Sequence, residues 1–233
     1  MQNLEKFNEF MLLDKNINKN ICNFLNNNVK NYNTNNFIKK NDHQQNNIKK
    51  EYFIPFSKDK MFWCFYKIIH PFWDENENFK LEKDFKISCI EKLRNNKQLI
   101  KSYRITLSYL ENDLLNEKMI SIKTLFGLAI LFKINLMYVF DNKFFELNFN
   151  SSDINNDTFL IIKKDNKDSL FIGNKDLDYY RNNFYYIENI NKPLKSISSY
   201  TLKDLEVISK KLQIDISNIK LKNDYYQLII EKF

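Results

Sequence analysis

Apolar positions recur every three or four residues across the segment from residue 57 to residue 133, which predicts a run of helices. The expected helices cover about 57–69, 80–95, 98–116 and 121–133. Ser57 and Ser121 are the expected N-caps of the first and last, and Pro71 follows the first. The run 61–66 is apolar on every face, so we expect it at the centre of the core.

After this segment the repeat of apolar positions shortens from about 3.6 residues toward 2 residues, which predicts strands. The expected strands cover about 135–140, 143–149, 158–164 and 168–172, and the aromatic stretch 179–188 is expected to form a final strand. Asp141-Asn142 and Asp165-Asn166 are the expected hairpin turns. Helices followed by a mainly antiparallel sheet predict an α+β domain over residues 51–190, with the helices packed on one face of the sheet.

The N-terminal segment differs from this central domain. Its first dozen residues predict a short amphipathic helix, because apolar side chains recur there at helical spacing, namely Leu4, Phe7, Phe10 and Met11. The Asn-rich stretch 16–50 has too few apolar residues to offset the entropy lost on ordering. We therefore expect residues 1–50 to form a disordered tail.

The C-terminal segment returns to a helical pattern after Pro193. Thr201 is expected to cap one helix, Asp224 is expected to open another, and an extended stretch lies between them. Residues 196–233 are therefore expected to form a small helix-extended-helix unit, which we call the C-terminal module.

Charge adds to this picture mainly through its distribution. The chain has 33 Lys against three Arg and is rich in Asn, Ile, Phe and Tyr, a bias that an AT-rich genome produces in any protein. Residues 1–50 carry eight basic and four acidic side chains, residues 51–189 carry 20 of each, and residues 190–233 carry eight and five. The excess of +7 therefore belongs to the two ends of the chain.

The three cysteines, Cys22, Cys64 and Cys89, have no CxxC spacing. This pattern favours reduced thiols in a reducing compartment and argues against a disulfide framework and against a zinc knuckle. The longest apolar stretch, 125–132, is far shorter than the roughly 20 residues that a membrane span needs. We therefore expect an intracellular protein without a membrane segment.

Three stretches of the sequence carry a resemblance: residues 62–66 (FWCFY), 90–97 (IEKLRNNK) and 192–200 (KPLKSISSY). They resemble an uncharacterised protein lineage of the nucleocytoplasmic large DNA viruses, the giant viruses, and the similarity extends from about residue 58 to the end. The resemblance implies a viral protein that acts in the host cytoplasm, at the viral factory, or in the virion. It indicates the origin of the protein rather than its activity.

The last 35 residues contain a further set of characteristic positions, namely Leu202, Leu205, Ile208, Lys220, Lys222, Asp224, Tyr225, Tyr226 and Ile229. At these positions the segment is similar to the SAP module, a helix-extended-helix element of many DNA-associated proteins. Asn218 stands where that family usually has Gly. The resemblance implies weak, sequence-blind DNA binding through phosphate contacts. The expected contacts are Lys203, Lys210, Lys211, Lys220 and Lys222. The alternative is a protein-docking unit of a viral assembly, since five acidic residues dilute the positive field of the module.

A second interpretation of the sequence, as a cysteine hydrolase, starts from Cys64. A cysteine on a core helix, followed by helices and then a sheet, resembles the papain-like and OTU-type cysteine peptidases, in which Cys64 would be the nucleophile. The histidine expected at the start of a late strand is absent, and Ser169 lies there instead. His70 faces away from Cys64 on the same helix, and His43 lies in the tail. The resemblance therefore implies an inactive relative of that fold, and the simplest alternative is a core cysteine.

Other signals for chemistry are weaker still. Two glycines in the whole chain exclude a glycine-rich phosphate loop. Asp74, Glu75 and Glu77 could bind a divalent ion, but a solvated loop is the simpler interpretation. An aromatic group with Arg181 between its members could stack on bases or pack in the core, namely Tyr179, Tyr180, Phe184, Tyr185 and Tyr186. We expect no cofactor, no bound metal and no small-molecule substrate, and a non-enzymatic function.

Overall fold

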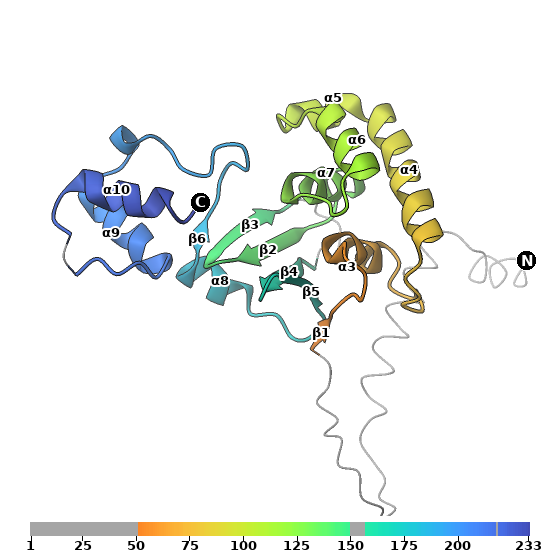
Figure 1. Ribbon diagram of the computed structural model, residues 1–233, viewed down its shortest axis with the longest axis horizontal. Helices are drawn as coiled ribbons and strands as arrows, with labels where there is room; N and C mark the ends of the chain where they lie inside the picture. The colour runs from red at the N-terminus through yellow and green to blue at the C-terminus, as the bar shows by residue number, and fades with distance from the viewer. Residues whose placement is uncertain (1–50, 150–156, 218) are drawn as a thin grey trace, which may run out of the picture. The chain divides into compact units, whose positions relative to one another are not determined.

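The fold is built around a mixed sheet with the strand order β1-β5-β4-β2-β3-β6 (Figure 1). The computed structural model describes residues 51–149, 157–217 and 219–233, which belong to one compact unit, Lys49–Phe233. The predicted tail and its amphipathic helix lie outside the described residues. The strands are β1 (Tyr52–Phe53), β2 (Leu136–Phe140), β3 (Lys143–Leu147), β4 (Phe159–Lys164), β5 (Lys167–Phe171) and β6 (Tyr185–Tyr186).

Both hairpins form where the sequence predicts them. The turns hold Asp141 and Asn142 at φ 43° and 60°, and Asp165 and Asn166 at φ 49° and 58°. Positive φ at both central residues is the geometry of the two-residue turn that matches strand twist, and Asn and Asp tolerate it better than other side-chain-bearing residues. Of the strand pairings in the described residues, β1–β5, β2–β3 and β4–β5 are antiparallel, whereas β2–β4 and β3–β6 are parallel. The α+β prediction is therefore confirmed, with a mixed sheet.

The helices of the described part are α3 (Lys60–Ile69), α4 (Phe79–Asn95), α5 (Lys97–Ser102), α6 (Leu107–Asn116), α7 (Ile122–Phe132), α8 (Leu177–Asn183), α9 (Leu202–Lys211) and α10 (Lys222–Ile230). A short 3-10 helix, η1 (Ile197–Ser199), precedes α9. Ser121 caps α7 as predicted. The expected single helix over 98–116 is wrong, because Arg104 adopts a left-handed φ of 58° and separates α5 from α6.

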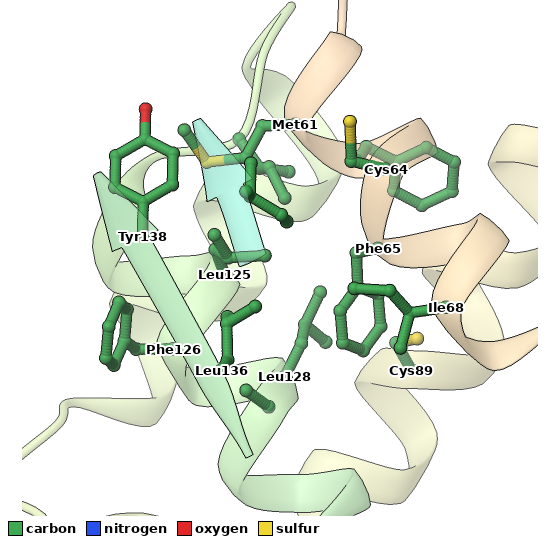
Figure 2. Close-up of a cluster of buried hydrophobic side chains, with 14 of the residues drawn as sticks. Met61, Cys64, Phe65, Ile68, Cys89, Leu125, Phe126, Leu128, Leu136 and Tyr138 are labelled. Atoms are coloured by element: carbon green, nitrogen blue, oxygen red, sulfur yellow. The ribbon is translucent and has the colours of Figure 1, made fainter. Parts of the chain in front are cut away.

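Helix α3 forms the centre of the core, as its apolar run predicts. Phe62, Trp63, Cys64 and Phe65 have no exposed surface. Figure 2 shows side chains of α3 and α7 meeting those of β2 in one apolar cluster. The expected N-cap Ser57 is wrong: the cap is Asp59, whose carboxylate accepts a hydrogen bond from the backbone N–H of Phe62 at 3.2 Å.

The opposite face of the sheet is covered by α8, so the prediction of helices on one face only is wrong. Met137, Val139, Phe144 and Leu160 form a second buried cluster. Leu177, Tyr180 and Phe184 pack against this cluster. The stretch expected as one final strand, 179–188, instead begins within α8 and continues into β6. Asp176 starts that helix, since its carboxylate accepts a hydrogen bond from the N–H of Tyr179 at 3.0 Å.

The C-terminal module has a small core of its own, made by α9 and α10. Its buried members are Leu205, Ile208, Leu212, Tyr225 and Ile229. Thr201 caps α9 as predicted and forms a reciprocal capping box with Asp204. Helix α10 begins at Lys222 rather than at Asp224. The two predicted helices are therefore present, and the described residues between them contain turns but no strand.

Candidate nucleic-acid interface

The five lysines singled out in the sequence all reach the surface of the module. Lys203, Lys210 and Lys220 are exposed, and Lys211 and Lys222 are half-buried. Within the described residues none of the five forms an ion pair with a carboxylate. The ammonium group of Lys211 donates a long hydrogen bond of 3.4 Å to the backbone carbonyl of Arg181. Their charges are therefore available to an anionic ligand.

These lysines do not form one surface. Lys222 lies near the first turn of α9, where hydrogen bonds from Thr201 and then the charge of Lys222 lower the pKa of Asp204. Lys210 and Lys211 lie at the other end of α9, about 10 Å from that turn at 1.5 Å of rise per residue. The predicted set thus divides into one group at each end of the helix.

The module is nearly neutral when its acidic residues are included. Residues 196–233 contain six lysines against Asp204, Glu206, Asp215, Asp224 and Glu231. The basic excess of the C-terminal end comes mainly from Lys192 and Lys195, which precede the module. These two side chains are exposed, and sequence reasoning did not select them.

Lys192 and Lys195 line a cavity of about 410 Å³ between β6 and α9, which we call the β6–α9 cleft. Lys211 and Val207 line its α9 side, and Tyr186 lines its β6 side. The cleft therefore joins residues from three separate stretches of the chain. Lys192 and Lys195 flank Pro193 within the stretch that resembles the viral lineage, and this was the signal that could have drawn attention to them.

Tyrosine hydroxyls fix the connection that forms one wall of the cleft. The Tyr226 hydroxyl donates a hydrogen bond to the carbonyl of Lys195 at 2.8 Å, and the Tyr200 hydroxyl accepts one from the N–H of Lys195 at 3.0 Å. The Tyr185 hydroxyl donates to the carbonyl of Pro193 at 3.2 Å. Burial, followed by the hydrogen bond with Tyr200, raises the pKa of Tyr185. These hydrogen bonds hold Lys195 in place in the wall of the cleft.

The predicted aromatic group separates into core and surface members. Tyr180 and Phe184 pack on the second buried cluster, while Tyr179 and Tyr186 are 53% and 45% exposed. The guanidinium of Arg181 forms ion pairs with Glu146 and Asp178, so its charge is already compensated. Tyr186 is the exposed aromatic residue of this group that also lines the β6–α9 cleft.

The surroundings of Cys64 do not form a catalytic site. Its thiol has no exposed surface, and burial raises its pKa well above the ordinary value, with the charge of Asp168 acting in the same direction. Figure 2 shows Cys64 projecting from α3 beside the buried cluster. The hydroxyl of Tyr138 donates a hydrogen bond to Asp168 at 2.7 Å. His70 follows the end of α3, where its ring contacts Tyr66 and Phe85.

The acidic residues considered for metal binding stabilise a loop instead. The carboxylate of Glu77 accepts hydrogen bonds from the backbone N–H groups of Phe56 and Ser57. Glu75 forms an ion pair with Lys67 at 3.0 Å, and Asp74 accepts a hydrogen bond from the N–H of Asn76. Across residues 51–149, 157–217 and 219–233, no group of three or more His, Cys, Asp or Glu side chains is arranged to hold a metal ion.

In the described ranges of the chain, none of the helices combines the length and the apolar character needed to cross a membrane. Comparisons of the chain with family models, with curated proteins and with solved structures gave no significant match.

Proposed function

We propose that this protein binds nucleic acid weakly and without sequence preference, through basic side chains of the C-terminal module. The observation that carries the proposal is that Lys203, Lys210, Lys211, Lys220 and Lys222 lack carboxylate partners within the described residues. Phosphate contacts of this kind fix position without reading bases. The near-neutral total charge of the module limits the affinity, since counterion release supplies most of non-specific binding.

Two acidic residues of the module have structural tasks that leave the lysines free. Asp204 accepts hydrogen bonds from the backbone N–H and the hydroxyl of Thr201. Asp215 accepts one from the N–H of Ser217 at 3.0 Å. Neither carboxylate forms a direct ion pair with a lysine in the described residues, although the charge of Lys222 acts on Asp204.

The biological setting belongs to the same proposal. The resemblance to a giant-virus lineage supports a viral DNA-associated or assembly protein that acts in the host cytoplasm or in the virion. The surroundings of Cys64 support no hydrolase function, because the buried thiol has a raised pKa and no histidine among the charged groups that act on it. A non-enzymatic role is therefore the function that we propose.

The test is a fluorescence-anisotropy titration of labelled duplex DNA with the full chain at several salt concentrations. Three to five neutralised phosphates predict a log-log salt slope of roughly −3 to −4.5, and an affinity no tighter than about 10⁻⁶ M at physiological salt. The variant Lys220→Glu/Lys222→Glu is expected to weaken binding and to reduce the slope. Its matched control is Lys80→Glu/Lys83→Glu on α4, where both lysines are exposed.

An equal loss of DNA affinity in the two double variants would show that binding depends on the total charge of the protein and not on the lysines of the module. Absence of measurable duplex binding at low salt would refute the proposal. In that case an acidic protein partner, docked on the same lysines, becomes the interpretation to pursue.

A further inference from the structure

Opposite walls of the β6–α9 cleft carry basic side chains. Lys192 and Lys195 come from the connection that follows β6, and Lys211 comes from α9. Lys195 is paired with Glu188 at 2.9 Å, but both side chains are more than half exposed, so water screens the pair. Lys192 and Lys211 have no carboxylate partner in the described part of the chain. Glu188 also lines the cleft, so its charged lining is three lysines and one glutamate, and an anion there would meet a net positive charge.

The same cleft also exposes flat and apolar surface. The ring of Tyr186 packs against Phe144 at a centroid distance of 5.2 Å and leaves 45% of the residue exposed. Val207, one turn before Lys211 on α9, is 54% exposed and lines the opposite side. Helical spacing places Lys203 on this same stripe, one turn before Val207. The cleft therefore combines an aromatic residue and an apolar side chain with lysines that can contact phosphates.

We propose that the β6–α9 cleft binds one unpaired nucleotide of a single-stranded nucleic acid, with the base on Tyr186 and the flanking phosphates on Lys192 and Lys211. A base stacked on an aromatic ring within a basic groove is the common mode of single-strand binding. A cavity of about 410 Å³ falls within the range of small-ligand pockets, about 300–1,000 Å³. Bases of an intact duplex are stacked inside the helix, so a duplex can contact the lysines but not Tyr186.

This inference rests on the proposed function, because it names the form of nucleic acid that the cleft selects. Two labelled probes separate the two proposals: a dT12 single strand, and a hairpin duplex with the same number of phosphates whose ends are joined by a non-nucleotide linker so that it has no unpaired base. Both are titrated at low salt against the full chain and its variants by fluorescence anisotropy. Poly-glutamate serves as a third probe for simple anion binding.

The first variant pair tests stacking. Tyr186→Ala is expected to weaken dT12 binding roughly five- to 150-fold, the range measured for loss of one stacked base, while hairpin binding stays unchanged. Tyr186→Phe keeps the ring and is expected to bind dT12 like the wild type. Unchanged hairpin binding also reports that Tyr186→Ala remains folded, which a purely structural role of the ring would not allow.

The second pair tests charge at two places. Lys192→Ala/Lys211→Ala is expected to reduce the dT12 salt slope by about 1.4, at about 0.7 per phosphate of a single strand. Lys220→Ala/Lys222→Ala removes the same charge outside the cleft and is expected to change the dT12 slope less. None of the four substituted lysines forms an ion pair in the described part of the chain, so their replacement breaks no ion pair. Comparing the two double variants therefore tests whether dT12 binds in the cleft, even if Tyr186→Ala fails to fold.

The outcomes distinguish the two proposals. Binding of both nucleic acids with no difference between the paired variants overturns the cleft and leaves the proposed function standing. Binding of dT12 without binding of the hairpin supports the cleft and refutes duplex binding by the module. If poly-glutamate binds as tightly as dT12 and Tyr186→Ala does not change its affinity, the cleft is a general anion surface and the inference is overturned. The absence of any binding also overturns it.

Discussion

Asp59 joins three parts of the core, and its replacement is expected to be among the most destabilising single changes in this chain. Its carboxylate accepts a hydrogen bond from the ammonium of Lys86 at 2.7 Å and others from the backbone N–H groups of Phe62 and Ile120. The side chains of Asp59 and Lys86 are only 2% and 7% exposed. The carboxylate therefore caps α3, anchors the segment before α7 and compensates a buried charge on α4.

Removing one partner of a buried ion pair costs about 3–5 kcal/mol, and losing an N-cap costs about 0.5–2 kcal/mol. Asp59→Ala is therefore expected to lower the free energy of unfolding by about 4–6 kcal/mol, a large part of the roughly 5–15 kcal/mol of an ordinary domain. Asp59→Asn keeps the cap and an acceptor oxygen, and Lys86 keeps Glu82 at 2.7 Å. We expect that variant to lose only about 2–3 kcal/mol.

Urea unfolding followed by tryptophan fluorescence measures these differences, because Trp63 and Trp73 stack at 4.9 Å in the core and separate on unfolding. The double variant Asp59→Asn/Lys86→Met removes both charges and is expected to recover part of the loss, with a coupling energy of at least about 1 kcal/mol. This account of the Asp59–Lys86 ion pair would be refuted if Asp59→Ala lowered the free energy of unfolding by less than about 1 kcal/mol, or if the double-mutant cycle showed no coupling energy.

Further predictions concern the thiols, α7 and a turn. Burial raises the pKa of Cys89 to about 12, so the stability contributed by its neutral thiol is present below pH 9 and is lost as the pH rises toward 12. By pH 10 Cys89 should account for about 1.4 kcal/mol of the loss, so Cys89→Ala should lose that much less than the wild type in urea unfolding at each pH. Native iodoacetamide labelling followed by mass spectrometry should leave Cys64 unmodified until urea unfolds the protein; rapid labelling would reopen the hydrolase reading. Gly127→Ala should destabilise by about 1 kcal/mol in thermal unfolding, because its Cβ would lie 2.7 Å from Leu110, a cost that exceeds the gain in helix propensity. Asn142→Ala should cost about 1 kcal/mol because of its φ of 60°, whereas Asn142→Gly should not; equal losses would contradict the turn assignment.

Features set by neighbouring residues were predictable from the sequence. The turn at Asp141-Asn142 and the caps Ser121 and Thr201 depend on residues within three positions, and the structure confirms all of them. Asp59 was missed as a cap although its bond to Phe62 is local, because Ser57 offers a cap-forming side chain two residues earlier. What favours Asp59 lies far along the chain, in Lys86 and Ile120, which are 27 and 61 residues away. The parallel pairings of the sheet were missed for the same reason, since hairpin signals do not specify how two hairpins meet.

The candidate site shows the same division. Periodicity and charge selected lysines on the module, because a surface helix displays its polar face in the sequence. The β6–α9 cleft was missed, because Tyr186, Lys192 and Lys211 become neighbours only when β6 and α9 are in place. The resemblance to papain-like enzymes placed Cys64 at a site, but that site needs a histidine from a distant strand, where the structure has Ser169 on β5.

The order of elements along the chain has a consequence for synthesis on the ribosome. Helix α3 contacts β5, which begins at Lys167, almost a hundred residues after α3 ends at Ile69. At about 5–20 residues per second, the face of α3 that contacts β5 is synthesised roughly 5–20 s before that strand. During that interval this face, which includes Cys64 with its thiol against the backbone of Leu170, is exposed on the nascent chain. A ribosome-associated chaperone that binds apolar segments is therefore expected to engage this helix before the sheet is complete.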